Sequence, residues 1–97
     1  MKKQKFYSMV REDGAIIAKL HEGYTDGTYN YYRKGSIWFA IYPANGLSIC
    51  TGNTRKAAAE TAHTPRMAER ITAALKWQPE KAEQFAALVE EAEKEAA

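Results

Sequence analysis

The chain has 97 residues, of which 45% are hydrophobic and 27% charged, so it fits one globular domain, 1–97, with a modest core. No apolar run approaches the roughly 18 residues of a membrane span, and the basic start lacks the apolar segment of a signal peptide. Cys50 is the single cysteine, which excludes an intrachain disulfide and a cysteine-based zinc site within one chain. We therefore expect a cytoplasmic protein with no membrane partner.

The net charge of +2 is unevenly distributed along the chain. Residues 1–56 contain nine basic and four acidic residues, a formal charge of +5, whereas 57–97 contain five basic and eight acidic residues, a charge of −3. Such asymmetry is typical of an anion-binding face, although small soluble domains also show it without any function.

The first half of the chain predicts antiparallel strands. Runs of β-forming residues near 5–11 and 15–21 flank Asp13-Gly14, a pair that favours a hairpin turn because both positions tolerate positive φ. Glycines and an aspartate predict a loop over 21–27. The tyrosine-rich segment near 28–33 predicts a third strand.

Residues 36–62 predict the last two strands of the sheet and the helix that follows them. A fourth strand near 37–42, a Pro-Ala-Asn-Gly turn over 43–46 and a fifth strand over 47–51 complete a meander. Side chains alternate along strands, so two faces are expected. One face carries Ile37, Phe39, Ile41, Leu47 and Ile49, and the other carries Trp38, Tyr42 and Cys50.

Three helices are predicted after the sheet. Asn53 or Thr54 caps a first helix that runs to Ala62, and Thr64-Pro65 starts a second one near 65–76. A third helix begins after Gln78-Pro79, with an apolar stripe and a face rich in glutamate.

These elements predict an α+β fold, in which an antiparallel meander of about five strands (1–51) precedes three helices (53–97) packed on one face. We expect the helices to cover the Ile37/Phe39/Ile41 face. The Trp38/Tyr42 face must then pack against the N-terminal hairpin, a second copy or a partner.

Catalysis has little support in the sequence. His21 and His63 lie at predicted element boundaries, without a carboxylate at helical spacing, and are expected to be solvated. A cysteine inside a strand, such as Cys50, usually packs as a small hydrophobe. The chain contains no phosphate-binding loop, HExxH or GxSxG motif. We therefore expect no enzymatic activity, no cofactor and no metal.

The start of the first helix is the first candidate ligand site. A helix N-terminus presents unpaired N–H groups and partial positive charge, which makes basic residues in its first turn locally unfavourable unless an anion binds. An alternative interpretation is that both basic side chains extend into water. The candidate residues for binding an anion are Asn53, Thr54, Arg55 and Lys56.

Aromatic and basic residues of the third and fourth strands form the second candidate. Exposed rings can stack on bases while basic side chains follow phosphates, although aromatic residues in a meander also form cross-strand pairs or protein-binding patches. Alternation places Tyr29, Tyr31 and Arg33 on one face and Tyr32 on the other. The candidate interaction face consists of Tyr29, Tyr31, Arg33, Lys34, Trp38 and Tyr42.

Residues 38–62 run as an apolar strand, a Pro-x-x-Gly turn, a second strand and Thr-Gly-Asn-Thr before an alanine-rich helix. This order resembles the strand-strand-helix portion of HicB-type antitoxins and, more loosely, the small three-stranded arm-binding domains of phage integrases. The resemblance covers about a quarter of the chain. It implies a small regulator or accessory protein of a mobile element, with the sheet and residues 52–56 as contact regions.

Two functions are therefore expected. The first is a non-enzymatic interaction module that binds a protein partner, or a second copy of itself as a homodimer, through the aromatic face. The alternative is a nucleic-acid-binding accessory protein that uses Arg33, Lys34, Arg55 and Lys56. An enzyme would require a deep pocket that joins His21 or His63 to Cys50 or to a buried carboxylate.

Overall fold

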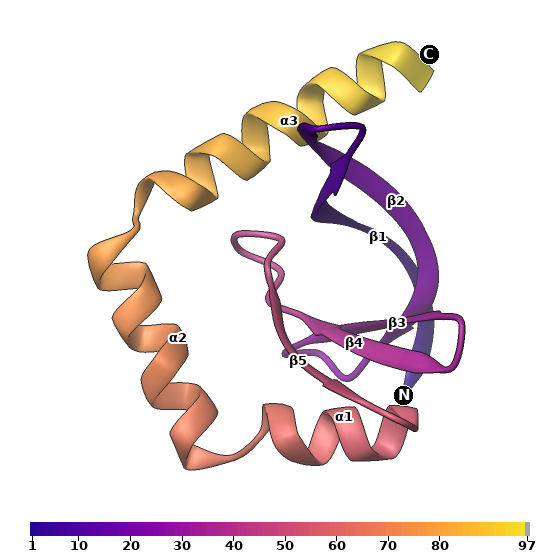
Figure 1. Cartoon of the computed structure of the whole chain (residues 1–97), viewed down its shortest axis with the longest axis vertical. Helices are drawn as coiled ribbons and strands as arrows, with labels where there is room; N and C mark the ends of the chain where they lie inside the picture. The colour runs from indigo at the N-terminus through magenta and orange to yellow at the C-terminus, as the bar shows by residue number, and fades with distance from the viewer. Residues whose placement is uncertain (97) are drawn as a thin grey trace.

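The computed structural model describes residues 1–96 and shows an α+β fold (Figure 1). Five antiparallel strands form one sheet in the order β1-β2-β3-β4-β5, and three helices follow them. The predicted fold class is confirmed. The elements are β1 (Lys2–Glu12), β2 (Ala15–Thr25), β3 (Asn30–Lys34), β4 (Ile37–Ile41), β5 (Ser48–Gly52), α1 (Arg55–Ala62), α2 (Pro65–Trp77) and α3 (Glu80–Ala96).

The loop predicted over 21–27 begins too early. β2 continues to Thr25, because Tyr24 and Thr25 pair with Tyr31 and Asn30 of β3. The glycine in this part of the strand, Gly23, lies so close to β3 that a Cβ atom would be 2.1 Å from the carbonyl oxygen of Tyr31. Only a residue without a side chain allows β2 to approach β3 at this point.

The sheet consists of two hairpins that share a short ladder. β1 and β2 pair along their whole length, β3 and β4 pair over five positions, but β2 and β3 pair only at Tyr24–Tyr31 and Thr25–Asn30. Beyond that ladder the hairpins diverge and the sheet curls. The backbone N–H of Met9 in β1 donates to the carbonyl of Gly46, in the loop before β5, at 2.7 Å.

The first helix covers the Trp38/Tyr42 face of the sheet, which was expected to pack against the N-terminal hairpin, a second copy or a partner. Ala58 and Ala62 of α1 are buried against Tyr29, Tyr31 and Ala40. Small residues let the helix approach closely, and Gly52 has the same role in β5, where a Cβ atom would lie 2.6 Å from the Ala58 nitrogen. The expectation that the helices cover the Ile37/Phe39/Ile41 face is therefore wrong for α1.

The Ile37/Phe39/Ile41 face is closed by the N-terminal hairpin instead. Phe6 of β1 forms a buried cluster with Tyr32 and Ile41, and Phe39 packs against it. The predicted position of Tyr32 on the opposite face from Tyr31 is confirmed by this cluster and by that of Tyr31.

One assignment on this face is wrong. The β4–β5 register shifts between Ala40 and Ile41, and Ile49 packs with the cluster under α1 rather than beside Ile41. A bulge adds one residue to a strand, which moves the following side chains to the other face. Alternation read from the sequence cannot show where such a bulge lies.

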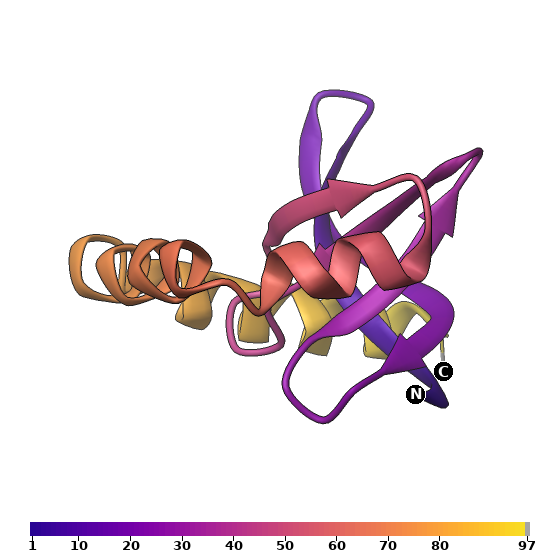
Figure 2. The same ribbon diagram turned by 90° about the horizontal axis from the view of Figure 1, so that it is seen from below.

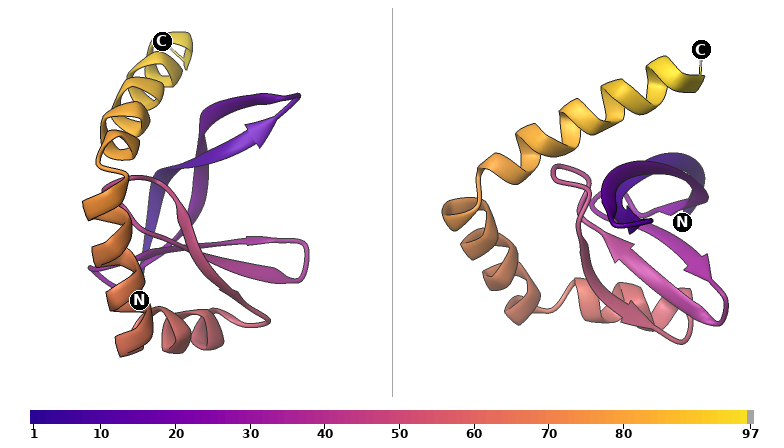
Figure 3. Two further views of the ribbon diagram at one scale, coloured as in Figure 1. Left: turned by 60° about the vertical axis from the view of Figure 1, so that its left-hand side comes forward. Right: turned by 45° about the horizontal axis from the view of Figure 1, so that its top comes forward.

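The helices form an arc around the sheet, whereas the tips of the two hairpins project from the other side (Figures 2 and 3). α3 packs across β2 and β1, and its Phe85 ring lies against Gly46, which has φ +67°. α2 links the other helices and contacts the β5 region through Met67 and Ile71. No helix within residues 1–96 is long and apolar enough to cross a membrane.

Candidate functional site

A group of one arginine and two aromatic rings marks the beginning of α1. The guanidinium carbon of Arg55 lies 3.9 Å from the centre of the Tyr24 ring and 5.8 Å from that of Trp38. The two rings are 6.1 Å apart and inclined by 51°. β2, β4 and α1 each supply one member, so three segments distant in sequence converge here. Together with Lys56, we call these residues the Arg55 surface.

Local sequence fixes the position of Arg55. Thr54 adopts an extended conformation, and its hydroxyl accepts a hydrogen bond from the Ala57 N–H at 3.0 Å, which makes Thr54 the N-cap rather than Asn53. Arg55 is therefore the first helical residue. Its side chain lies on the rings of the sheet, where the positive charge is attracted to their π-electrons.

A hollow of about 700 Å³ opens over this surface. Its lining includes Tyr24, Trp38, Thr54, Arg55, Lys56 and Glu60. Within residues 1–96, neither Arg55 nor Lys56 forms an ion pair with a carboxylate. Both positive charges are thus available to an external anion.

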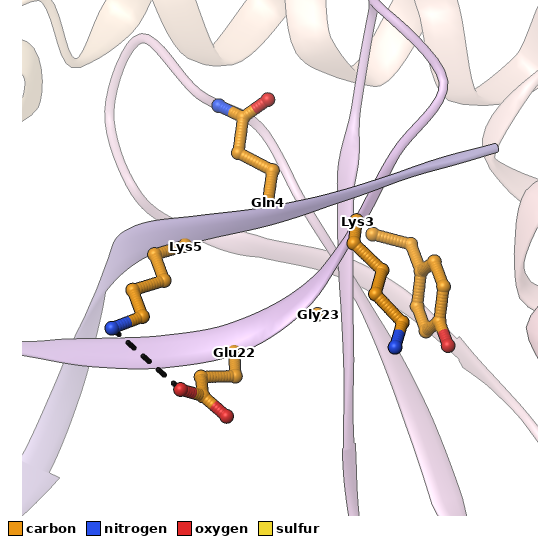
Figure 4. Close-up of a pocket in the computed structure, with 6 residues that line it drawn as sticks. Lys3, Gln4, Lys5, Glu22 and Gly23 are labelled. Atoms are coloured by element: carbon orange, nitrogen blue, oxygen red, sulfur yellow. Dashed lines mark ion pairs between the residues drawn. The ribbon is translucent and has the colours of Figure 1, made fainter.

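A second hollow adjoins the first along β1 and β2. It has a volume of about 510 Å³ and is lined by Lys3, Gln4, Lys5, Glu22, Gly23 and Tyr24 (Figure 4). The Nζ atom of Lys5 lies 3.7 Å from a carboxylate oxygen of Glu22, whereas Lys3 forms no ion pair within residues 1–96. Because Tyr24 lines both hollows, Lys3 extends the basic surface toward the N-terminus.

The predicted aromatic interaction face is only partly accessible. Tyr29 and Tyr31 expose 7% and 0% of their surface, because α1 packs on them, so their prediction as members of an open face is wrong. Trp38 and Tyr42 lie at the edge of the same cluster and are half-buried.

Arg33 and Lys34 do not join the Arg55 surface. Both are exposed at the tip of the β3–β4 hairpin, where they line a different hollow. Tyr24 was absent from the predicted site because it fell in the predicted loop. The signal that could have found it is the pair Tyr24-Thr25, since both residue types are common in strands.

His63 has a carboxylate partner that sequence spacing does not reveal. Its Nε2 lies 2.6 Å from Oδ2 of Asp26, and the Tyr31 hydroxyl donates to the same oxygen at 2.6 Å. The other oxygen, Oδ1, accepts from the N–H groups of Thr28 and Tyr29 at 2.9 and 2.7 Å. Asp26 thus connects the β2–β3 loop to the end of α1.

These bonds determine the charge state of Asp26. Burial alone would raise the pKa of its carboxyl, but the hydrogen bonds from Tyr29, Tyr31 and His63 outweigh burial and hold the pKa well below its usual range. Burial and the bond to this carboxylate raise the pKa of Tyr31 in turn. A carboxylate with four donors has no free lone pair with which to accept a substrate proton, so the cluster acts as a structural clamp.

His21 is not solvated at a boundary as expected. It lies inside β2, its ring stacks on Tyr32 with centres 3.8 Å apart, and Nε2 lies 2.6 Å from the hydroxyl of the fully buried Ser8. Burial, reinforced by the positive charge of Lys19, lowers the pKa of His21. The protonated form of the ring is therefore disfavoured in the folded protein.

Cys50 packs as the sequence predicts. Its Sγ lies 3.5 Å from the carbonyl oxygen of Ala58, and burial raises the pKa of its thiol. A thiol with a raised pKa is a poor nucleophile at neutral pH. In the chain up to residue 96, no three His, Cys, Asp or Glu side chains gather in a way that could hold a metal ion.

Comparison of the chain with protein families, curated proteins and solved structures finds no match. The resemblance of residues 38–62 to HicB-type antitoxins and integrase arm-binding domains therefore stays a prediction.

Proposed function

We propose that this chain is a non-enzymatic module that binds single-stranded nucleic acid through the Arg55 surface. The observation that carries the proposal is the position of the Arg55 guanidinium over the rings of Tyr24 and Trp38. Two functions were expected from the sequence. The first, protein binding through a broad aromatic face, has less support because Tyr29 and Tyr31 are buried. Tyr24 and Trp38 remain partly accessible, and they lie beside Arg55 and Lys56.

The position of Arg55 over aromatic rings suits nucleic acid for a chemical reason. A guanidinium held over an aromatic ring still offers N–H donors to phosphate oxygens, and guanidinium planes also stack on bases. Lys56 and Lys3 extend the positive charge on either side. Bases stack on such mixed surfaces with little sequence preference, at about 1–3 kcal/mol each.

The test is fluorescence anisotropy with a labelled oligothymidylate at low salt. The Arg55→Gln and Lys56→Gln variants are expected to weaken binding, and Trp38→Phe tests the contribution of the indole while retaining a ring in the core. Arg66→Gln is the matched control, because Arg66 is an exposed arginine in the first turn of the next helix. Equal affinity in Arg55→Gln and the unchanged protein would refute the proposal.

A protein partner, including a second copy of this chain, is the other candidate. The observation in its favour lies at the end of α2, where Trp77 exposes 76% of its surface and Leu75 39%. Large exposed apolar residues are depleted on the surfaces of monomers and enriched at interfaces. Sedimentation equilibrium of the unchanged chain and of Trp77→Gln tests self-association: a monomer at all concentrations would exclude the homodimer.

A further inference from the structure

The register of the first hairpin continues the Arg55 surface onto β1. Lys3 lies directly opposite Tyr24 in the β1–β2 ladder, and Lys5 lies opposite Glu22. Residues paired in this way share a face of the sheet, and their Cβ atoms are about 4.5–5.5 Å apart. Figure 4 shows Gln4, the residue between the two lysines, pointing away from them. Both lysines therefore lie on the same face as Tyr24.

Trp38, the second ring of the Arg55 surface, belongs to this face as well. Tyr24 pairs with Tyr31, and Arg33, two residues later, pairs with Trp38. Since alternate residues of a strand share a face, the register places Trp38 with Tyr24, and their ring centres are 6.1 Å apart. The hollow at the beginning of α1 and the hollow between β1 and β2 thus open on one face, and Tyr24 lines both.

Positive charge exceeds negative charge along this face. The charged residues that line the two hollows are the basic Lys3, Lys5, Arg55 and Lys56 and the acidic Glu22 and Glu60. Within residues 1–96, the ion pair formed by any of the four basic residues is that of Lys5 with Glu22. The side chains of this pair are 68% and 82% exposed, so water and salt screen their attraction. Lys5 can therefore exchange Glu22 for a phosphate at little cost.

We infer that the hollow between β1 and β2 is a second subsite of the Arg55 surface, where Lys3 and Lys5 contact backbone phosphates of a single strand that crosses Tyr24. The inference rests on the proposed function, because it assumes the same ligand. A base stacked at Tyr24 has basic side chains on both sides, so the phosphates that flank it are both neutralised. The ligand is accordingly an oligonucleotide that reaches from Arg55 to Lys5, rather than a mononucleotide.

Glu22 has a separate effect in this arrangement. When Lys5 binds a phosphate, the carboxylate of Glu22 stays in the hollow beside the strand and repels its backbone. Glu22 therefore lowers the affinity for strands that reach β1, and it has little effect on strands confined to the beginning of α1. Removal of this acid should strengthen the binding of long strands selectively.

The experiment measures fluorescence anisotropy of labelled oligothymidylates, from a dinucleotide to a dodecanucleotide. Lys3→Gln and Lys5→Gln should each weaken binding of the dodecanucleotide about two- to five-fold, the range for one exposed charge contact, and leave the dinucleotide unchanged. Lys2→Gln is the matched control, because Lys2 is an exposed lysine of the same strand that alternation places on the opposite face. Equal weakening by all three variants would indicate diffuse attraction and would overturn the inference.

The acidic variant tests the position of the strand from the other direction. Glu22→Gln should strengthen binding of the dodecanucleotide about two- to five-fold, without a gain for the dinucleotide. Glu12→Gln is its control, since Glu12 is also an exposed acid of the first hairpin paired with a lysine, Lys19. An equal gain in both variants, or no gain in Glu22→Gln, would contradict the second subsite.

The outcomes also separate this inference from the proposed function. If Lys3→Gln binds the dodecanucleotide as the unchanged protein does, while Arg55→Gln weakens both lengths, the second subsite is refuted and the Arg55 surface stands. If Arg55→Gln binds both lengths as the unchanged protein does, the proposed function fails, and the second subsite fails with it.

Discussion

The carboxylate of Asp26 lies 2.6 Å from the Nε2 atom of His63, a residue 37 positions later in the chain. This contact joins the loop between the two hairpins to the end of α1, and it completes a set of hydrogen bonds that includes the buried hydroxyl of Tyr31. It keeps α1 in place over the sheet, and the beginning of the same helix carries the Arg55 surface. Stability and the proposed site are therefore linked through α1.

Removal of the Asp26 charge should destabilise the fold. In Asp26→Asn the side chain loses an acceptor oxygen, and the Tyr31 hydroxyl or His63 loses its partner, so we expect a loss of about 1–3 kcal/mol in the free energy of unfolding. Urea denaturation at neutral pH measures it. Asp13→Asn is the control, because Asp13 is exposed in the β1–β2 turn and asparagine tolerates its φ of 50°.

The lowered pKa of Asp26 also predicts that the free energy of unfolding decreases at acidic pH. The pKa of Asp26 is depressed in the folded state, so its contribution is fully present above the unfolded value, near 3.8, and is lost as pH falls toward the lower native pKa. The unchanged protein should therefore lose stability more steeply below pH 4 than Asp26→Asn. Parallel acid-unfolding curves for the two proteins would contradict this assignment.

His21 predicts a second and separate pH effect. Its pKa is lowered by burial, so the unfolded chain binds a proton more readily than the folded one. The free energy of unfolding should then decrease as pH falls below about 6.5, and the decrease should end once the native pKa is passed. Denaturation between pH 5 and 7.5 measures the slope, which His21→Gln should flatten. An unchanged slope in that variant would show that another group titrates.

Gly52 allows α1 to approach β5. In Gly52→Ala the new Cβ atom would lie 2.6 Å from the backbone nitrogen of Ala58, so the helix must move and its packing is disturbed. We expect a loss of stability of about 1–3 kcal/mol, as for other overpacked sites. Gly35→Ala is the control: it has space for a Cβ atom, and its positive φ costs only about 1 kcal/mol of strain. Thermal unfolding of both variants provides the comparison.

The proposed nucleic-acid surface predicts a defined salt dependence. For a single strand, the slope of log affinity against log salt is about −0.7 for each phosphate neutralised. The Arg55→Gln/Lys56→Gln double variant should therefore have a slope shallower by about 1.4. Anisotropy titrations at several salt concentrations measure it. An unchanged slope, with affinity equal to that of the Arg66→Gln control, would place the phosphate contacts elsewhere.

Local sequence signals were sufficient to predict the elements of the fold. The Asp13-Gly14 turn, the aromatic and β-branched runs, and the Thr-Pro start of α2 act within a few residues of one another. Such signals do not depend on the rest of the chain, which is why the five strands and three helices were predicted in the correct order. The errors in their bounds, as at Thr25, arise where a partner strand extends the pairing.

The packing of the two sheet faces was predicted less well, because it depends on contacts between segments that are far apart in the sequence. Both faces of β4 are apolar, so composition could not decide whether α1 or the N-terminal hairpin covers Trp38. The bulge after Ala40 then moved Ile49 to the other side. Close packing of α1 at Ala58 depends on Gly52 of β5, a contact between distant segments that alternation does not describe.

The sequence by itself therefore determined the element order, the meander and the basic residues at the start of α1, because propensity, turn chemistry and capping are local. Only the tertiary structure decided which rings those basic residues meet. It placed Tyr24 and Trp38 under Arg55, buried Tyr29 and Tyr31, and paired His63 with Asp26. The physical reason is that long-range packing optimises buried area and hydrogen bonding over the whole chain, and neither quantity can be read from the spacing of residues along it.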